Sequence, residues 1–234
     1  MAGYPIELEL RDKRALVVGL GPVGRRKVAG LVAAGARVVV VDPAADRLAA
    51  WPAEVEICAE LYRSEHLQGM TLAFAAASAT VNRTVVADAR RAGVWVGSAT
   101  DPKEGDFTVP AVWREGPLTL TVSTSGASPA LAAALRDRAA KALGPAAAGL
   151  ASLLAELRPE VLARLGDRAE VRRRILADWA DPRWIDLWLA EGPEAVRRAL
   201  GERLAYEIAG SSPPLGDGQE RDGGGAEPWP APLS

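Results

Sequence analysis

Three glycines near the start of the chain follow an apolar run with the spacing G-x-G-x-x-G. They are Gly19, Gly21 and Gly24, in the segment VVGLGPVGRRK. In this pattern the first glycine permits a tight turn, the second lets backbone approach a pyrophosphate, and the third lets a helix pack closely on a strand. Asp42 ends the next apolar run, at about the separation expected for a carboxylate that accepts hydrogen bonds from both ribose hydroxyls. The glycines and the acid together predict a dinucleotide site.

The charge of Asp42 decides which dinucleotide we expect. A carboxylate at this place repels a 2′-phosphate, so the sequence predicts NAD as the cofactor. NADP stays open as the alternative, because Arg25 or Arg47 would be able to reach a 2′-phosphate. The simpler alternative is an ordinary strand-to-helix turn in which Asp42 merely ends its strand. The expected cofactor contacts, with the phosphates at the positive end of the following helix, are Gly19, Gly21, Pro22, Val23, Gly24 and Asp42.

The elements that position these residues alternate along the first hundred residues. Short apolar runs rich in β-branched residues predict strands over 15–20, 37–42, 55–60, 72–77 and 94–99. Ala-rich amphipathic segments predict helices over 23–35 and 80–93. Because the apolar runs do not alternate with polar residues, we expect strands that are covered by helices on both faces. The predicted fold class is α/β, with a Rossmann-type parallel sheet domain.

A different pattern begins after residue 107. The segment LTLTVST alternates as a half-exposed strand does, and a turn at 115–117 leads into it. A helix is expected over 128–144, with Ser128 as its N-cap and Pro129 in its first turn. Further helices are expected up to residue 209, with breaks near Pro159, Gly166, 181–182 and 192–193.

These patterns predict four parts of the chain. They are an NAD-binding Rossmann domain over 1–112, a small strand–helix region for dimerisation and substrate over 113–145, a C-terminal helical domain over 146–209, and a disordered tail over 210–234. The tail is expected because the segment is rich in Gly and Pro and has almost no periodic apolar residues.

Composition excludes several classes of function. The chain has 28 basic and 30 acidic residues, which argues against non-specific binding to nucleic acid. Charges in the first residues argue against a signal peptide, and no window is long enough for a membrane span, so we expect a cytoplasmic protein. Cys58 and His66 are the single cysteine and the single histidine. We therefore expect no committed metal site, and neither zinc-dependent nor Tyr-x-x-x-Lys dehydrogenase chemistry fits.

Asp101 lies in the loop GSATDPKEGDF, directly after the last predicted strand of the sheet. An Asp-Pro pair ordinarily starts a turn, because the carboxylate accepts hydrogen bonds from nearby amides. However, the carboxyl ends of parallel strands share one edge of a sheet, which is also where the glycine loop lies. Asp101 is therefore a candidate for acid/base chemistry, with a turn as the alternative.

Four separated segments now resemble a known family. They are YPIELELRDKRALVVGLGPVGRRK, VNRTVVADAR, SATDPKEGDFTVPAV and LTLTVSTSGASPALAAALR. Their order and spacing resemble the precorrin-2 dehydrogenase family, the amino-terminal module of siroheme synthase, over residues 4 to about 143. The resemblance implies oxidation of precorrin-2 to sirohydrochlorin with NAD, in siroheme or related tetrapyrrole synthesis. Some members also insert ferrous iron.

The resemblance also implies roles for single residues. Asp101 matches the loop aspartate of the family, which is the favoured general acid/base. Asn82 matches an asparagine near the nicotinamide edge, with stabilisation of its own helix as the alternative. The implied contacts to substrate carboxylates, for which the alternatives are a helix cap and a solvated helix face, are Thr124, Ser125, Gly126, Ser128 and Arg136.

This chain departs from the family pattern at a few positions. Ser98 stands where an asparagine is common, and Thr124 stands where a serine is found. We therefore expect dehydrogenase activity and leave metal insertion open. The resemblance and the half-exposed strand imply a homodimer. A non-catalytic NAD-sensing module is the alternative function, but it does not explain the Asp-Pro loop.

Overall fold

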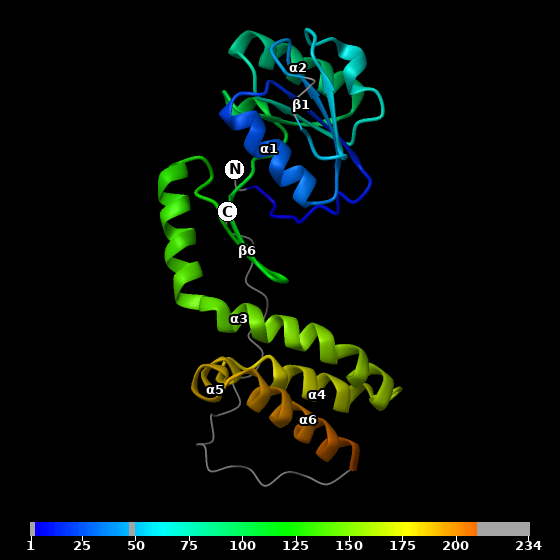
Figure 1. The fold of residues 1–234 in the computed structure, drawn as a ribbon, viewed down its shortest axis with the longest axis vertical. Coiled ribbons are helices and arrows are strands. Elements are labelled where there is room, and N and C mark those ends of the chain that lie inside the picture. The colour runs from blue at the N-terminus through cyan, green and yellow to red at the C-terminus, as the bar shows by residue number, and fades with distance from the viewer. Residues whose placement is uncertain (1–2, 47–49, 210–234) are drawn as a thin grey trace, which may run out of the picture. The chain divides into compact units, whose positions relative to one another are not determined.

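The computed structural model describes residues 3–46 and 50–209 (Figure 1). The chain forms two compact units: residues up to 113 together with 120–139, and residues 114–119 together with those from 140 onward. Two compact units do not test the predicted division into functional parts, so the separate dimerisation and substrate region over 113–145 stays a prediction. The tail predicted over 210–234 lies outside the described residues.

Five parallel strands form the sheet of the first unit. The strands are β1 (Arg14–Val18), β2 (Arg37–Val41), β3 (Val55–Cys58), β4 (Leu72–Ala75) and β5 (Trp95–Ser98). Their order is β3-β2-β1-β4-β5, and every neighbouring pair is parallel. The predicted Rossmann-type sheet is therefore confirmed. The predicted strands ran one or two residues too far at their carboxyl ends, because those residues turn away from the ladder into the loops that carry the site.

Helices α1 (Pro22–Ala33) and α2 (Ala79–Ala92) cover opposite faces of this sheet. Successive strand residues point to opposite faces. Val17 therefore lies in the core with side chains of α1, whereas Leu16 lies in the core with side chains of α2. Both helices stop where a glycine adopts a positive φ, as the sequence predicts: Gly93 directly follows α2 with φ of 68°, and Gly35 lies just beyond α1.

A two-stranded sheet and a long helix follow. The sheet pairs β6 (Ala111–Glu115) with β7 (Leu118–Val122). Helix α3 (Pro129–Leu165) is capped by Ser128, whose Oγ accepts from the Leu131 amide at 3.2 Å, so the predicted cap is confirmed. The predicted break at Pro159 is wrong, because α3 continues to Leu165. The helix does kink at Gly144, where φ is 64° and ψ is 177°, and this confirms the predicted end of the helix over 128–144.

The second unit is built from the later part of α3 with α4 (Ala169–Trp179), α5 (Arg183–Glu191) and α6 (Pro193–Ala209). Trp179 and Trp184 are buried in its core, at 2% and 7% exposure. The breaks predicted near Gly166 and Gly192 are confirmed, and both glycines have a positive φ. Among the helices described, none is both long and apolar enough to cross a bilayer.

Candidate active site

At two of the three motif glycines, nearby backbone atoms leave no room for a side chain. Gly19 has φ of 97°, and a Cβ added there would lie 2.5 Å from the carbonyl oxygen of Ala76. A Cβ added at Gly24 would overlap the carbonyl oxygen of Gly19. The Gly19 amide donates to the Val41 carbonyl at 2.9 Å, which ties the turn to β2. The glycine loop is thus held between β2 and the end of β4 before any ligand binds.

Gly21 differs from its two neighbours, because a Cβ added there would meet nothing within 4 Å and its φ of −66° suits any residue. The protein itself gives no reason for glycine here, and close approach by a cofactor stays a prediction. Gly21 is also the N-cap of α1, where no side chain caps the helix and the first turn contains no acidic residue. The Asp42 carboxylate lies close to this turn, because it accepts from the amide of Leu20, the residue before Gly21. Amides in this arrangement attract a phosphate. Pro22 and Val23 belong to the same turn.

Asp42 joins the ends of three strands. Its Oδ2 accepts from the Leu20 amide at 2.6 Å, and its Oδ1 accepts from the Ala44 amide at 2.8 Å. Its own amide donates to the Cys58 carbonyl at 3.2 Å. Each carboxylate oxygen can accept a further hydrogen bond, so Asp42 is able to hold the glycine loop and to accept from ribose hydroxyls as well.

Arg25 and Arg47 are the two residues that would be able to bind the 2′-phosphate of NADP. The Arg25 guanidinium lies over the Trp51 ring, 5.6 Å from its centre. Arg47 lies outside the described residues. The structure therefore gives Arg25 a partner within the protein, and the preference for NAD stays a prediction.

Asn82 is fully buried and connects the loops after β4 and β5. Its Oδ1 accepts from the Ala77 amide at 2.9 Å, while its Nδ2 donates to the Ala77 carbonyl and to Thr100 Oγ1, both at 3.2 Å. Through these contacts Asn82 stabilises the loops after β4 and β5, which agrees with its alternative role of stabilising local structure. Contact with the nicotinamide stays a prediction. Sequence reasoning missed Thr100, because an exposed Thr in a loop carries no signal of its own.

Asp101 is exposed on the loop after β5. Its Oδ1 accepts from the Lys103 amide at 2.9 Å, and its own amide donates to Ser98 Oγ at 3.3 Å. The turn predicted for the Asp-Pro pair therefore exists. Because β1 and β5 are parallel members of one sheet, Asp101 and the glycine loop lie at the same carboxyl edge. An acid/base role stays a prediction.

The turn before α3 forms a second group of predicted residues. Thr124 Oγ1 accepts from the Ser128 amide at 3.1 Å and donates to the Ser128 carbonyl at 3.0 Å. Ser125 and Gly126 both have a positive φ. Arg136 is bonded to Asp137, and its Nη1 lies 3.4 Å from the Val112 carbonyl oxygen. Within the described residues, no hydrogen bond joins this turn to Asp101.

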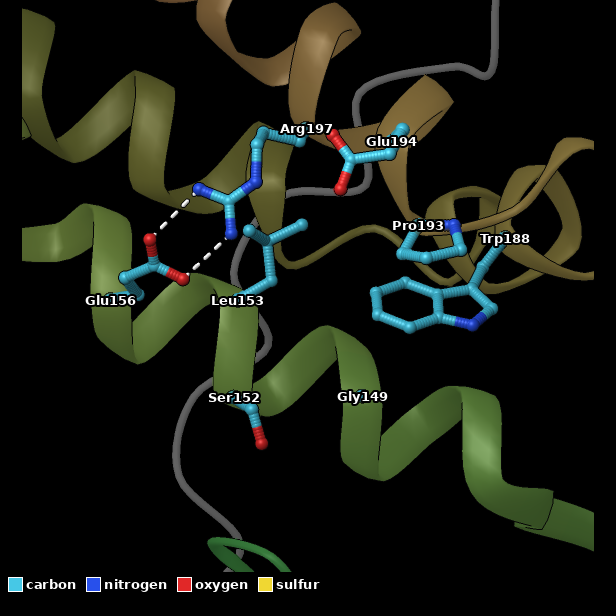
Figure 2. Close-up of a pocket in the computed structure, with 8 residues that line it drawn as sticks. All are labelled: Gly149, Ser152, Leu153, Glu156, Trp188, Pro193, Glu194 and Arg197. Atoms are coloured by element: carbon cyan, nitrogen blue, oxygen red, sulfur yellow. Dashed lines mark hydrogen bonds and ion pairs between the residues drawn. The ribbon is translucent and has the colours of Figure 1, made fainter.

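The second unit contains a cavity of about 240 Å³ between α3, α5 and α6, shown in Figure 2. Glu156 and Arg197 form a bidentate ion pair at its edge, at 2.9 and 2.7 Å, and this pair lowers the pKa of the Glu156 carboxyl. Trp188 lies against Gly149, where a Cβ would overlap its ring. The residues that line this cavity include none of the predicted site residues.

Family models match the two regions of the chain that contain the predicted site residues. A family model described as "Putative NAD(P)-binding" matches residues 6–111, and one described as "Sirohaem biosynthesis protein central" matches residues 115–140. Siroheme synthase 1 of Aeromonas salmonicida is 34% identical over 214 residues, which is 88% of this chain and 45% of that protein. The chain is homologous to the siroheme synthases. This confirms the resemblance that the four sequence segments indicate.

Other relatives agree with this homology. Siroheme synthase of Chromobacterium violaceum is 38% identical over 210 residues, covering 88% of this chain and 44% of that protein. The chain thus spans less than half the length of these siroheme synthases. The solved structure of SirC, a precorrin-2 dehydrogenase, aligns with a TM-score of 0.66 and 20% identity, over 87% of this chain and 99% of that one. At this identity the match shows a shared fold.

Proposed function

We propose that the chain is an NAD-dependent precorrin-2 dehydrogenase, which oxidises precorrin-2 to sirohydrochlorin in siroheme or related tetrapyrrole synthesis. The observation that carries the proposal is the shared carboxyl edge of one parallel sheet, where the glycine loop, Asp42 and Asp101 all lie. In the reaction, precorrin-2 loses one hydride and one proton. The hydride goes to NAD⁺, which becomes NADH, and the proton goes to a base on the protein and then to water.

The loop after β1 would hold the cofactor. The amides at the start of α1 would bind the pyrophosphate where Gly21 leaves open space, and Asp42 would accept from the ribose hydroxyls. NAD supplies the hydride acceptor when bound. The negative charge of Asp42 favours NAD over NADP, since a 2′-phosphate would be repelled.

Asp101 would act as the proton acceptor. Its carboxylate is exposed, so it is accessible to a substrate. A short chain of hydrogen bonds connects its loop to the buried Asn82. In that chain Ser98 Oγ accepts from the Asp101 amide and lies 3.3 Å from Thr100 Oγ1, which in turn accepts from Asn82. Asn82 and Thr100 would therefore position the loop, and Asp101 would exchange the proton.

The turn from Thr124 to Ser128 and the side chain of Arg136 would bind substrate carboxylates. Ser125 and Gly126 are exposed, and Arg136 keeps part of its guanidinium accessible. Hydroxyls, turn amides and a guanidinium are the groups that recognise a polyanionic macrocycle.

A homodimer and a cytoplasmic location belong to the same proposal. Leu131 and Leu135 lie one turn apart on α3 and are 51% and 43% exposed, which leaves an apolar face for a second copy of the chain to cover. Light scattering at micromolar concentration tests the dimer, and a monomer there would contradict it. Fractionation of cells that express the protein tests the location.

An anaerobic assay with purified protein, precorrin-2 and NAD tests the proposed function. We expect NADH and sirohydrochlorin to form in equal amounts. Binding of NAD without any turnover of precorrin-2 would favour an NAD-sensing module instead. Ferrous iron added afterwards shows whether the same protein also speeds metal insertion.

A further inference from the structure

Three side chains of metal-ligating types lie at the carboxyl end of β3, and none of them is assigned a role above. The cluster is next to the cofactor side, because the Asp42 amide donates to the Cys58 carbonyl. Cys58 ends β3, Glu60 follows two residues later, and His66 lies in the short 3₁₀ helix η1 (Ser64–Leu67). The Cys58 Sγ, one carboxylate oxygen of Glu60 and one ring nitrogen of His66 all lie within 4.8 Å of one another. We propose that these residues bind one divalent metal ion of the zinc class.

The local backbone brings the three side chains together. The Glu60 amide donates to the Cys58 carbonyl at 2.9 Å, which closes a tight turn between the two residues. The amide of His66 donates to the Arg63 carbonyl at 3.1 Å, which starts η1. Cys58 is also packed against the core that α2 shares with the sheet. The cluster is therefore part of the folded sheet edge and not an encounter between loose side chains.

The distances fit a small tetrahedral site. His66 Nε2 lies 2.9 Å from Glu60 Oε1. With metal–sulfur and metal–nitrogen bonds of about 2.3 and 2.0 Å, ligand atoms in a tetrahedral zinc site lie about 3.3 to 3.5 Å apart. The three ligand atoms lie at most 4.8 Å apart, so each pair is within about 1.5 Å of that separation. Three protein ligands would leave the fourth position to water.

The surroundings of His66 suit a metal ligand. Its Nδ1 lies 3.0 Å from both the amide nitrogen and the carbonyl oxygen of Arg63. Without a metal, Nδ1 accepts from the Arg63 amide and Nε2–H faces Glu60 Oε1. Binding of a metal at Nε2 would move the ring proton to Nδ1, which would then donate to the Arg63 carbonyl. Metal-bound histidines commonly donate their second nitrogen to a backbone carbonyl in this way. The histidine side chain is only 11% exposed, so its orientation is held by packing as well.

The charges balance for a divalent ion. A thiolate and a carboxylate together carry two negative charges, which a divalent cation neutralises. The Arg63 guanidinium lies 3.0 Å from Glu60 Oε2, the oxygen that does not face the histidine, and can remain there. Sulfur with imidazole and one carboxylate selects zinc-class ions over Mg²⁺ or Ca²⁺, which prefer oxygen ligands only. Binding would release the thiol proton to solvent.

The test uses the full chain without an affinity tag, reduced and stripped of metal with a chelator. Because Cys58 and His66 are the single cysteine and histidine, no other thiol or imidazole competes. Titration with Co²⁺ should show one equivalent bound and a thiolate-to-cobalt charge-transfer band. Cys58→Ser, Glu60→Gln and His66→Gln should each weaken Co²⁺ binding at least tenfold. Glu56→Gln, an exposed carboxylate on the same strand, is the matched control and should bind as the wild type does.

A second measurement needs no variant and so does not depend on how the variants fold. One equivalent of Zn²⁺ should slow alkylation of Cys58 in the wild-type protein at least tenfold. Alkylation at an unchanged rate, or Co²⁺ bound without a charge-transfer band, would overturn the proposal. The precorrin-2 assay is independent of either outcome.

Discussion

The two halves of the proposed active site are built in different ways. On the cofactor side, Gly19 and Gly24 leave no room for a Cβ, and Asn82 is fully buried with all its contacts inside the protein. On the substrate side, Asp101 is exposed, and its hydrogen bonds within the described residues go to Ser98 at the end of β5 and to Lys103 and Glu104 of its own loop. The cofactor side is thus fixed by the fold, whereas the substrate side leaves its polar groups available. The difference implies that substitutions on the cofactor side lower stability, and that those on the substrate side lower activity alone.

The largest effect is expected for Gly24→Ala. The new Cβ would overlap the carbonyl oxygen of Gly19, so helix α1 or the loop must shift. We expect a loss of about 3 kcal/mol in the free energy of unfolding, at the upper end for overpacking, together with loss of NAD binding. Urea unfolding and calorimetry measure the two quantities.

Gly30→Ala is the matched control for that substitution, since Gly30 lies in the same helix and a Cβ there meets nothing within 4 Å. It should raise stability by about 0.5 to 1 kcal/mol, because alanine is the better helix former. Equal stability of the two variants would show that the glycine loop is not rigid.

Asn82→Ala should produce the next largest loss. It removes three hydrogen bonds and leaves the amide and carbonyl of Ala77 without their partner. We expect about 2 to 3 kcal/mol lower stability by thermal unfolding, since each unsatisfied buried group costs about 1 to 3 kcal/mol. Thr84→Ala, an exposed position on the same helix, should change stability by less than about 0.5 kcal/mol. If Asn82→Ala also changed stability by less than about 0.5 kcal/mol, the result would contradict the role of Asn82 in holding the two loops together.

Arg136→Ala probes the substrate side. Because the guanidinium is held by Asp137 and at 3.4 Å from one backbone carbonyl, its removal should change stability by less than about 1 kcal/mol. The KM for precorrin-2 should rise about tenfold with little change in kcat, as loss of one charge-assisted contact of about 1.4 kcal/mol implies. Arg138→Ala, an exposed arginine of the same helix, should leave KM unchanged. An equal rise of KM in both variants would point to general charge and not to a contact of Arg136.

The smallest effect concerns pH. Burial and the neighbouring Asp88 carboxylate, which accepts from its hydroxyl, raise the pKa of Tyr62. A phenol whose pKa is higher in the folded state stabilises the fold below its unfolded pKa of about 10, and this contribution is lost as pH rises above that value. Wild-type stability should therefore fall more steeply above pH 10 than that of Tyr62→Phe. Parallel pH profiles of the thermal midpoint would contradict this.

Local patterns in the sequence were enough to predict the glycine loop and the place of Asp42 at the end of its strand. The spacing of Gly19, Gly21 and Gly24, and the place of Asp42 after its strand, depend on residues that are near one another in the chain. The cap at Ser128 was predictable for the same reason. The helix boundary at Pro159 was not, because Val161 and Leu165 beyond it are buried in the helical core and packing keeps α3 continuous.

Contacts between loops could not be predicted in the same way. Asn82 bonds to Thr100 across two strand ends, so its role depends on which strands are neighbours in the sheet. The cluster of Cys58, Glu60 and His66 depends on a tight turn followed by a 3₁₀ helix, and neither has a clear sequence pattern. A single histidine and a single cysteine in the sequence therefore predict no metal site, although the two residues lie only eight positions apart.

The most direct test of the central claim is the turnover of precorrin-2 with NAD by the Asp101→Asn variant, measured anaerobically next to its unfolding curve. The substitution removes the proton acceptor and keeps the shape of the side chain. We expect kcat to fall at least about 100-fold, the lower bound for loss of a general base, with NAD affinity unchanged and stability within about 0.5 kcal/mol of the wild type. Full turnover by this variant would contradict the assignment of Asp101 as the base at the carboxyl edge of the sheet.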